Sequence, residues 1–149
     1  RRNLGIMKYF AELNSSGEVL RVLVFKDNIT NSEIESTPHE ENGTSWIEAF
    51  KDGTRGNFPG VGYTYDVSRN VFIGPKHFNS WVWSNSVLDW ESPQGAEPSN
   101  SVLGDGTPEY SQWWDEENLR WLRYRIADAK PRQNYVWEPD NNKWIGVEL

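Results

Sequence analysis

Aromatic residues recur along this chain at one spacing, with polar residues between them. Four times an aromatic residue is followed seven positions later by another, in Tyr65–Phe72, Trp83–Trp90, Trp114–Trp121 and Trp137–Trp144. Positions seven apart face each other on one side of a β-hairpin when a four- or five-residue loop joins the strands, and cross-strand aromatic pairs stabilise such hairpins. The spacing therefore predicts four antiparallel hairpins, each with a pair of facing rings.

The residues between the paired aromatics are typical of turns. An acceptor side chain opens each turn, which is a position that such side chains favour. These residues are Asp66, Ser84, Asp115 and Glu138. Asparagine lies near the exit of three turns, where a left-handed residue is commonly required. These residues are Asn70, Asn118 and either Asn141 or Asn142.

The N-terminal part of the chain repeats the pattern in a weaker form. Leu13 and Leu20 have the same spacing, with Gly17 between them at the expected turn. Residues 9–12 before this segment are largely apolar, and residues 22–25 after it are strongly β-prone. We expect a fifth, degenerate hairpin here.

Residues 110–125 fit two interpretations. Their aromatic residues also lie at helical spacing, and Pro108 could begin such a helix. We favour a hairpin, because Trp114–Trp121 closely parallels Trp137–Trp144 in its acidic, asparagine-containing turn.

The whole chain, residues 1–149, is predicted to form a single mainly β domain, a series of antiparallel hairpins with little helix. Its length suits one ordinary domain. Segment 92–108 contains three prolines and three glycines and is expected to be a long loop. Residues 109–149 after it are a candidate C-terminal hairpin subunit. The polar, acidic segment 27–44 is a second expected loop.

Residues 1–6 precede the first predicted strand, as an upstream extension, a processing remnant or a tag remnant. They are too short and lack the apolar core of a signal peptide, so we expect no secretory signal. No apolar run in the chain approaches the ~18 residues of a membrane span, so we expect no membrane partner.

Charge and cysteine content narrow the functional classes. The formal net charge is −7, and its repulsion for phosphate argues against a nucleic-acid partner. The absence of cysteine excludes disulfides, thiolate metal sites and thiol catalysis.

The sequence contains no recognisable catalytic constellation. His39 and His77 are far apart in sequence and lack metal-ligand spacing, and we interpret both as ordinary surface or turn histidines. The carboxylates of residues 115–117 lie in a predicted turn, whereas a general acid needs a buried carboxyl group with a raised pKa. We therefore expect a non-enzymatic protein with no catalytic, cofactor-binding or metal-binding residues and no cofactor.

Two features remain open to more than one interpretation. Residues 120–132 contain five basic residues and one acidic residue, Asp128. The basic residues form either a docking face for an acidic partner or a charged strand edge that discourages pairing with another strand. The five are Arg120, Arg123, Arg125, Lys130 and Arg132. The hairpin tryptophans form either buried pairs, which we favour, or exposed faces that stack on sugar rings.

Several segments also resemble a known family. Residues 59–81, which read PGVGYTYDVSRNVFIGPKHFNSW, resemble the signature of small virion proteins of tailed bacteriophages, especially marine ones. Proteins of this family open with a segment similar to residues 7–14 and continue into an apolar strand similar to residues 19–25. They close with a hairpin similar to residues 135–144.

The resemblance covers most of residues 7–93 and again residues 109–149, in the same order. The chain departs from the family at His77, where proline is usual, and in segment 94–134, which resembles an insertion with an extra hairpin. The resemblance implies a structural component of the virion, tail-fibre-like or baseplate-associated. It would dock in many copies, or as a homo-oligomer, on other virion proteins. The alternatives are a glycan-binding module for host attachment and a capsid decoration protein.

Overall fold

The computed structural model describes residues 6–149 and confirms the predicted fold class. It is mainly β, with 42% strand and 6% helix. The described residues form two compact units. Unit 1 comprises residues up to Pro75 together with Trp83–Asp89, and unit 2 comprises Lys76–Val82 and Trp90–Leu149. The single domain over 1–149 and the hairpin subunit at 109–149 stay predictions, and residues 1–5 of the expected extension lie outside the described residues.

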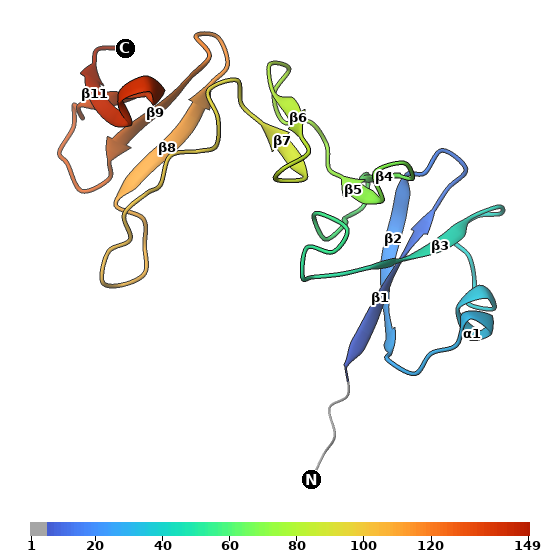
Figure 1. Ribbon diagram of the computed structural model, residues 1–149. Coiled ribbons are helices and arrows are strands. Elements are labelled where there is room, and N and C mark those ends of the chain that lie inside the picture. The colour runs from blue at the N-terminus through green and yellow to red at the C-terminus, as the bar shows by residue number, and fades with distance from the viewer. Residues whose placement is uncertain (1–5) are drawn as a thin grey trace. The chain divides into compact units, whose positions relative to one another are not determined.

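Unit 1 is built on a three-stranded antiparallel sheet. Its strands are β1 (Met7–Leu13), β2 (Val19–Lys26) and β3 (Ser45–Ala49), in the order β2-β1-β3 (Figure 1). The weak N-terminal hairpin is present, but a register shift places Leu13 opposite Val19 and not Leu20.

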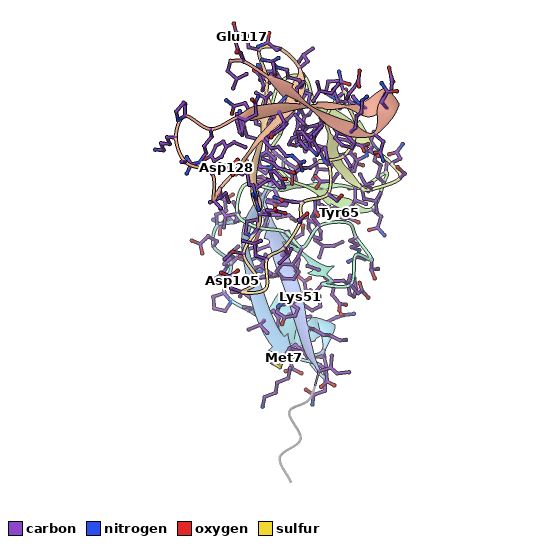
Figure 2. All side chains as sticks on the ribbon, turned by 90° about the vertical axis from the view of Figure 1, so that its left-hand side faces the viewer. Met7, Lys51, Tyr65, Asp105, Glu117 and Asp128 are labelled. Atoms are coloured by element: carbon purple, nitrogen blue, oxygen red, sulfur yellow. The ribbon has the colours of Figure 1, made fainter. Side chains whose placement is uncertain are left out.

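The core of unit 1 joins this sheet to the first aromatic hairpin. Buried residues of the sheet pack with Phe72, which is completely buried. Lys51 lies over two of the partly buried rings, with its Nζ 4.5 Å from the ring centroid of Tyr9 and 5.4 Å from that of Phe58. Figure 2 shows Lys51 beside the strands of this sheet. The hairpin is therefore part of the fold of unit 1 and not an appendage.

A short helix, α1 (Asn31–Glu35), lies in the expected loop 27–44 and beside β3 (Figure 1). The Thr30 side chain accepts a hydrogen bond from the Glu33 main-chain N–H (3.2 Å), and the Thr30 hydroxyl donates to the Glu33 carboxylate (2.9 Å). Side-chain capping of this kind satisfies the first N–H groups of a helix. Ile34 anchors the single turn by its burial.

Two short hairpins follow in the chain. In the first, β4 (Thr64–Asp66) pairs with β5 (Val71–Ile73), and the Tyr65 and Phe72 rings face each other with centroids 5.2 Å apart, as predicted. In the second, β6 (Val82–Ser84) and β7 (Asp89–Glu91) form a two-stranded sheet. The boundary between the units passes through this sheet, so the Trp83/Trp90 pair stays a prediction.

Unit 2 contains a four-stranded antiparallel sheet, in the order β11-β10-β9-β8. Its strands are β8 (Tyr110–Asp115), β9 (Arg120–Arg125), β10 (Asn134–Glu138) and β11 (Lys143–Val147).

The predicted aromatic pairs of unit 2 are confirmed. Trp114 lies opposite Trp121 with ring centroids 5.3 Å apart, and Trp137 lies opposite Trp144 at 5.2 Å. The strands β8 and β9 replace the helix that was the alternative for residues 110–125.

All four hairpin turns have a left-handed residue at the same position, five residues after the first aromatic. Their φ angles lie between 53° and 56°. The residues are Asn70, Leu88, Leu119 and Asn142. The prediction of Asn118 for the third turn was wrong, because the spacing from Trp114 sets this position more strongly than the identity of the residue.

The acceptor that opens each predicted turn also has a common role in the first three hairpins. It accepts the main-chain N–H three residues later, from Arg69 to Asp66 (2.9 Å), from Val87 to Ser84 (3.4 Å) and from Asn118 to Asp115 (3.4 Å). The fourth turn differs. Its Glu138 side chain makes no such bond, and Pro139–Asn141 form a single 3-10 turn.

Candidate functional site

The basic segment of β9 and the following loop is not a row of free cations. Arg120 forms an ion pair with Asp115 (2.8 Å), and Arg125 forms one with Glu109 (3.2 Å). Arg132 donates to main-chain carbonyl oxygens that follow β9. Three of the five basic side chains are thus held by partners inside unit 2, which weakens the interpretation of this segment as a broad basic docking face.

Arg123 is held differently, by aromatic rings. Its Cζ lies 3.7 Å from the ring centroid of Tyr110 and 4.2 Å from that of Trp144, with Tyr135 more distant at 6.0 Å. Its Nε atom is buried and has no hydrogen-bond partner. Among residues 6–149, no carboxylate forms an ion pair with this guanidinium group.

Burial lowers the pKa of Arg123 from its ordinary value, and the nearby Tyr110 and Glu109 partly offset this effect. An arginine remains protonated in proteins at neutral pH. The rings stabilise the positive charge by cation–π contacts, but they do not accept conventional hydrogen bonds from its N–H groups. Arg123 therefore keeps unused donor capacity.

A cleft of about 560 Å³ in unit 2 opens onto Arg123. Trp137 and Trp144 line it from β10 and β11, and loop residues, among them Pro98 and Ser99, line it from segment 92–108. Both tryptophans are only partly buried, whereas Trp114 and Trp121 are buried, with 5% and 4% of their surface exposed. The favoured interpretation of tryptophans as buried pairs is confirmed for Trp114/Trp121 and does not hold fully for Trp137/Trp144.

Hydrogen bonds hold the loop wall of the cleft against β8. The Asn100 side chain donates to the Tyr110 carbonyl oxygen (2.6 Å) and accepts from the Tyr110 N–H (3.2 Å). The Gln112 side chain donates to the Pro98 carbonyl oxygen (2.8 Å). Because both walls are fixed within unit 2, the cleft is preformed. One cation, aromatic surface and small polar groups together are typical of a ligand-binding site.

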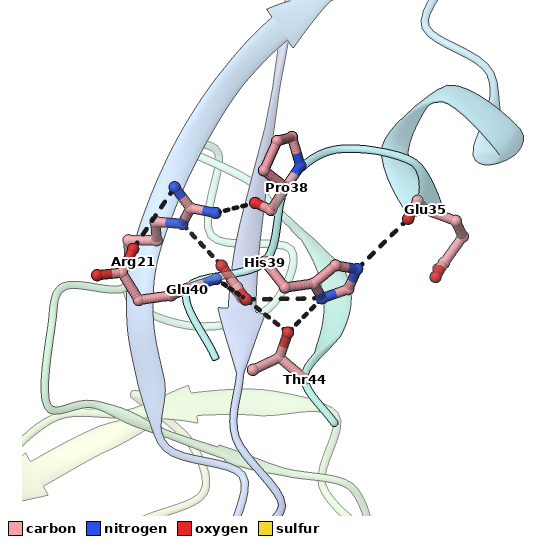
Figure 3. A network of polar contacts seen from close by, with 7 residues as sticks. Arg21, Glu35, Pro38, His39, Glu40 and Thr44 are labelled. Carbon is pink, nitrogen blue, oxygen red and sulfur yellow. Dashed lines mark hydrogen bonds and ion pairs between the residues drawn. The ribbon is translucent and has the colours of Figure 1, made fainter. Parts of the chain in front are cut away.

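Unit 1 contains a second polar cluster, around the carboxylate of Glu12 on β1 (Figure 3). Glu12 is fully buried and accepts hydrogen bonds from Arg21 Nε (2.7 Å), from the Glu40 main-chain N–H (2.8 Å) and from the Thr44 hydroxyl. His39 Nδ1 lies 3.7 Å from the same carboxylate. The donors to the Glu12 carboxylate lie on β2 and in the loop before β3, so Glu12 holds that loop against the sheet.

The pKa of Glu12 is set by two opposing effects. Burial alone raises the pKa of this carboxyl group, but the hydrogen bonds from Thr44, Arg21 and the Glu40 N–H outweigh it, and the pKa lies below its ordinary value. Glu12 is therefore ionised at neutral pH. A buried carboxylate with these donors is suited to holding structure, since a general acid requires a raised pKa.

The carboxylates of residues 115–117 are not arranged as an acid–base pair. Asp115 is bound to Arg120, whereas Glu116 accepts hydrogen bonds from the Ser80 N–H (2.9 Å) and the Trp114 indole N–H (2.7 Å). Hydrogen bonds to Ser80 and Trp114 lower the pKa of Glu116. Both carboxylates therefore bind donors of their own unit.

The two histidines lie in different surroundings. His39 belongs to the Glu12 cluster, and the His77 ring lies beside Trp81, with centroids 6.4 Å apart. Within residues 6–149 no three histidine or acidic side chains are grouped in a way that could hold a metal ion. The expectation of no catalytic, cofactor-binding or metal-binding residue stays a prediction.

Comparison of the chain with protein-family models, with curated proteins and with solved structures gave no match. Neither α1 nor any other helix within residues 6–149 is long and apolar enough to cross a membrane. Two polar groups of the described residues remain as candidates: Arg123, which lies between aromatic rings, and Glu12, which is fully buried.

Proposed function

We propose that this protein is a non-enzymatic structural component of a tailed-phage virion. In this proposal it is associated with the tail, a fibre or the baseplate and docks in many copies on other virion proteins. The observation that carries the proposal is the open edge of the sheet in unit 1. An edge strand presents unpaired main-chain groups, which are a template for pairing with another chain.

β2 is such an edge. It is eight residues long and pairs with β1 on one side. On its other side, Val19 bonds to Gly62 and Tyr63, and within residues 6–149 no named strand pairs with the remainder. Val24, near its end, is 53% exposed. A long, apolar, partly exposed edge favours association through β-strand addition.

The placement of the family-like segment 59–81 also supports a structural role. Its central part forms the β4–β5 hairpin, whose Val71 and Phe72 are buried in unit 1. Residues that resemble the family signature therefore build the fold, as expected for a component selected for its shape.

A glycan-binding module for host attachment is the second candidate, and the cleft beside Arg123 and Trp144 favours it. A capsid decoration protein would use the same edges and differ from the main proposal only in location. Both alternatives also place the protein in the virion. Location within the particle distinguishes a capsid decoration protein from a tail component, and glycan binding distinguishes a host-attachment module.

A density map of the purified particle tests the proposal. We expect the fold of unit 1 to be located in the tail, fibre or baseplate, with the β2 edge against a neighbouring subunit. A well-resolved map of the whole particle in which no density fits either unit would contradict it.

A further inference from the structure

We infer that the cleft around Arg123 binds an acidic saccharide, with a sugar carboxylate at the Arg123 guanidinium group and a sugar ring against Trp137 or Trp144. This inference does not depend on the proposed virion role. It assigns a ligand class to the cleft that Arg123, Trp137 and Trp144 line.

The first step of the argument is the charge. β9 carries three arginines. Arg120 and Arg125 are ion-paired, whereas Arg123 has no carboxylate or carbonyl partner among residues 6–149. The planar guanidinium group carries five donors in a geometry that matches a carboxylate. A partly buried cation that has no ion-pair partner and lies beside a cleft is therefore a natural partner for an anionic ligand group.

The second step is the aromatic surface. Trp137 and Trp144 line the same cleft as Arg123 and are only partly buried. The C–H face of a pyranose ring is apolar and packs on an indole ring, while its hydroxyl groups need polar neighbours. Asn142 and Ser99, which also line the cleft, supply them.

The third step is the size and rigidity of the cleft. Its volume of about 560 Å³ lies in the range of roughly 300–1,000 Å³ that is usual for small-molecule sites. The Asn100–Tyr110 and Gln112–Pro98 hydrogen bonds hold its loop wall in place. Little conformational freedom would be lost on binding, which favours affinity.

The same features disfavour an acidic peptide as the ligand. A peptide carboxylate could reach Arg123, but an aspartate or glutamate side chain carries no ring to cover the two indoles. The net charge of −7 also repels a dense polyanion, whereas a single carboxylate needs only the local field of Arg123.

Calorimetric titration of the chain tests the inference with five probes. Four are tri-galacturonate, tri-mannuronate and the methyl ester of each, which keeps the ring and removes the charge. The fifth is hexaglutamate, an acidic peptide. We expect one or both acids to bind, and the matching ester to bind at least about tenfold more weakly, because a hydrogen bond to a charged group is lost.

Variants assign the binding to the cleft. Arg123→Gln should abolish binding, and Trp137→Ala should weaken it about tenfold or more. Arg120→Gln is the matched control on the same strand, and it should bind as the original chain does. Arg123→Lys, which keeps the charge, should bind more weakly than the original chain because a lysine cannot form the bidentate contact. If Arg123→Gln does not fold, the comparison of acid with ester on the original chain decides.

Three results would overturn the inference. One is the absence of binding by both acids to the folded chain, and another is equal affinity for acid and ester. The third is binding of hexaglutamate as tightly as of the acidic trisaccharides, which would assign the cleft to a protein carboxylate.

Discussion

Leu119 and Asn142 occupy the same position in two hairpin turns, five residues after Trp114 and Trp137, and both have a φ of 53°. This left-handed conformation is tolerated by asparagine, but it brings the Cβ of most other residues too close to the following carbonyl oxygen. The turn geometry of this chain is thus set by the spacing of its aromatic pairs, and leucine adopts it at a cost.

Replacement of Leu119 by asparagine should therefore stabilise the protein. We expect Leu119→Asn to raise the free energy of unfolding by about 1 kcal/mol, since Leu119 is 41% exposed and its replacement removes limited packing. Chemical denaturation measures the change. Asn142→Leu is the reciprocal control and should destabilise by a similar amount; a stabilised Asn142→Leu would show that the turn is not strained.

The two tryptophan pairs of unit 2 should respond differently to truncation. Trp121 is 4% exposed and packs on Trp114 and Trp81, so Trp121→Ala should cost about 3–5 kcal/mol of stability. Trp137→Ala, at a partly exposed position, should cost clearly less. Thermal midpoints of both variants make the comparison, and equal losses would contradict the difference in burial.

Removal of the buried Glu12 charge should destabilise unit 1 in a pH-dependent way. Glu12→Gln leaves the donors around it without a charged acceptor and should cost about 1–3 kcal/mol near neutral pH. Because the folded-state pKa of Glu12 is lowered, its contribution is complete above the ordinary value of 4.5 and is lost as the pH falls through the lowered pKa.

Unfolding free energies of the original chain and of Glu12→Gln, measured from pH 7 to pH 3, should therefore converge in acid. The control is Glu41→Gln, an exposed residue of the same loop, which should leave stability unchanged. A constant difference between the Glu12→Gln and original proteins over the whole range would show that the Glu12 charge is not what holds the loop.

A charge on the β2 edge should impair assembly without unfolding the chain. Val24→Lys introduces a device by which natural proteins prevent edge pairing, at a position that is already 53% exposed. We expect a normal thermal midpoint and reduced incorporation into particles. Val67→Lys, in the exposed β4–β5 turn, is the control and should be incorporated normally. Equal incorporation of both variants would remove β2 from the proposed interface.

The sequence predicted the hairpins well because cross-strand pairing is local. A repeat of seven residues places Tyr65 on Phe72, Trp114 on Trp121 and Trp137 on Trp144 without knowledge of the rest of the fold. The short helix α1 was missed, although Thr30 and Glu33 together carry a capping pattern.

The candidate sites were less predictable, because they depend on contacts distant in sequence. Arg123 was included in the basic cluster, but nothing in the sequence distinguished it from Arg120, whose partner Asp115 lies across one hairpin. Glu12, a lone acid in an apolar strand, was a usable indication of a buried charge. Its donors Glu40 and Thr44 lie about 30 positions away, beyond the reach of any local pattern.

Quantitative mass spectrometry of gradient-purified particles is the most direct test of the central claim. The proposal implies a phage that encodes this chain. The particles would come from a host infected with such a phage, and the copy number would be measured relative to known virion proteins. The proposal predicts a fixed, multi-copy ratio that persists through repeated purification. A chain that is abundant in the infected-cell lysate but absent from the particles would contradict it.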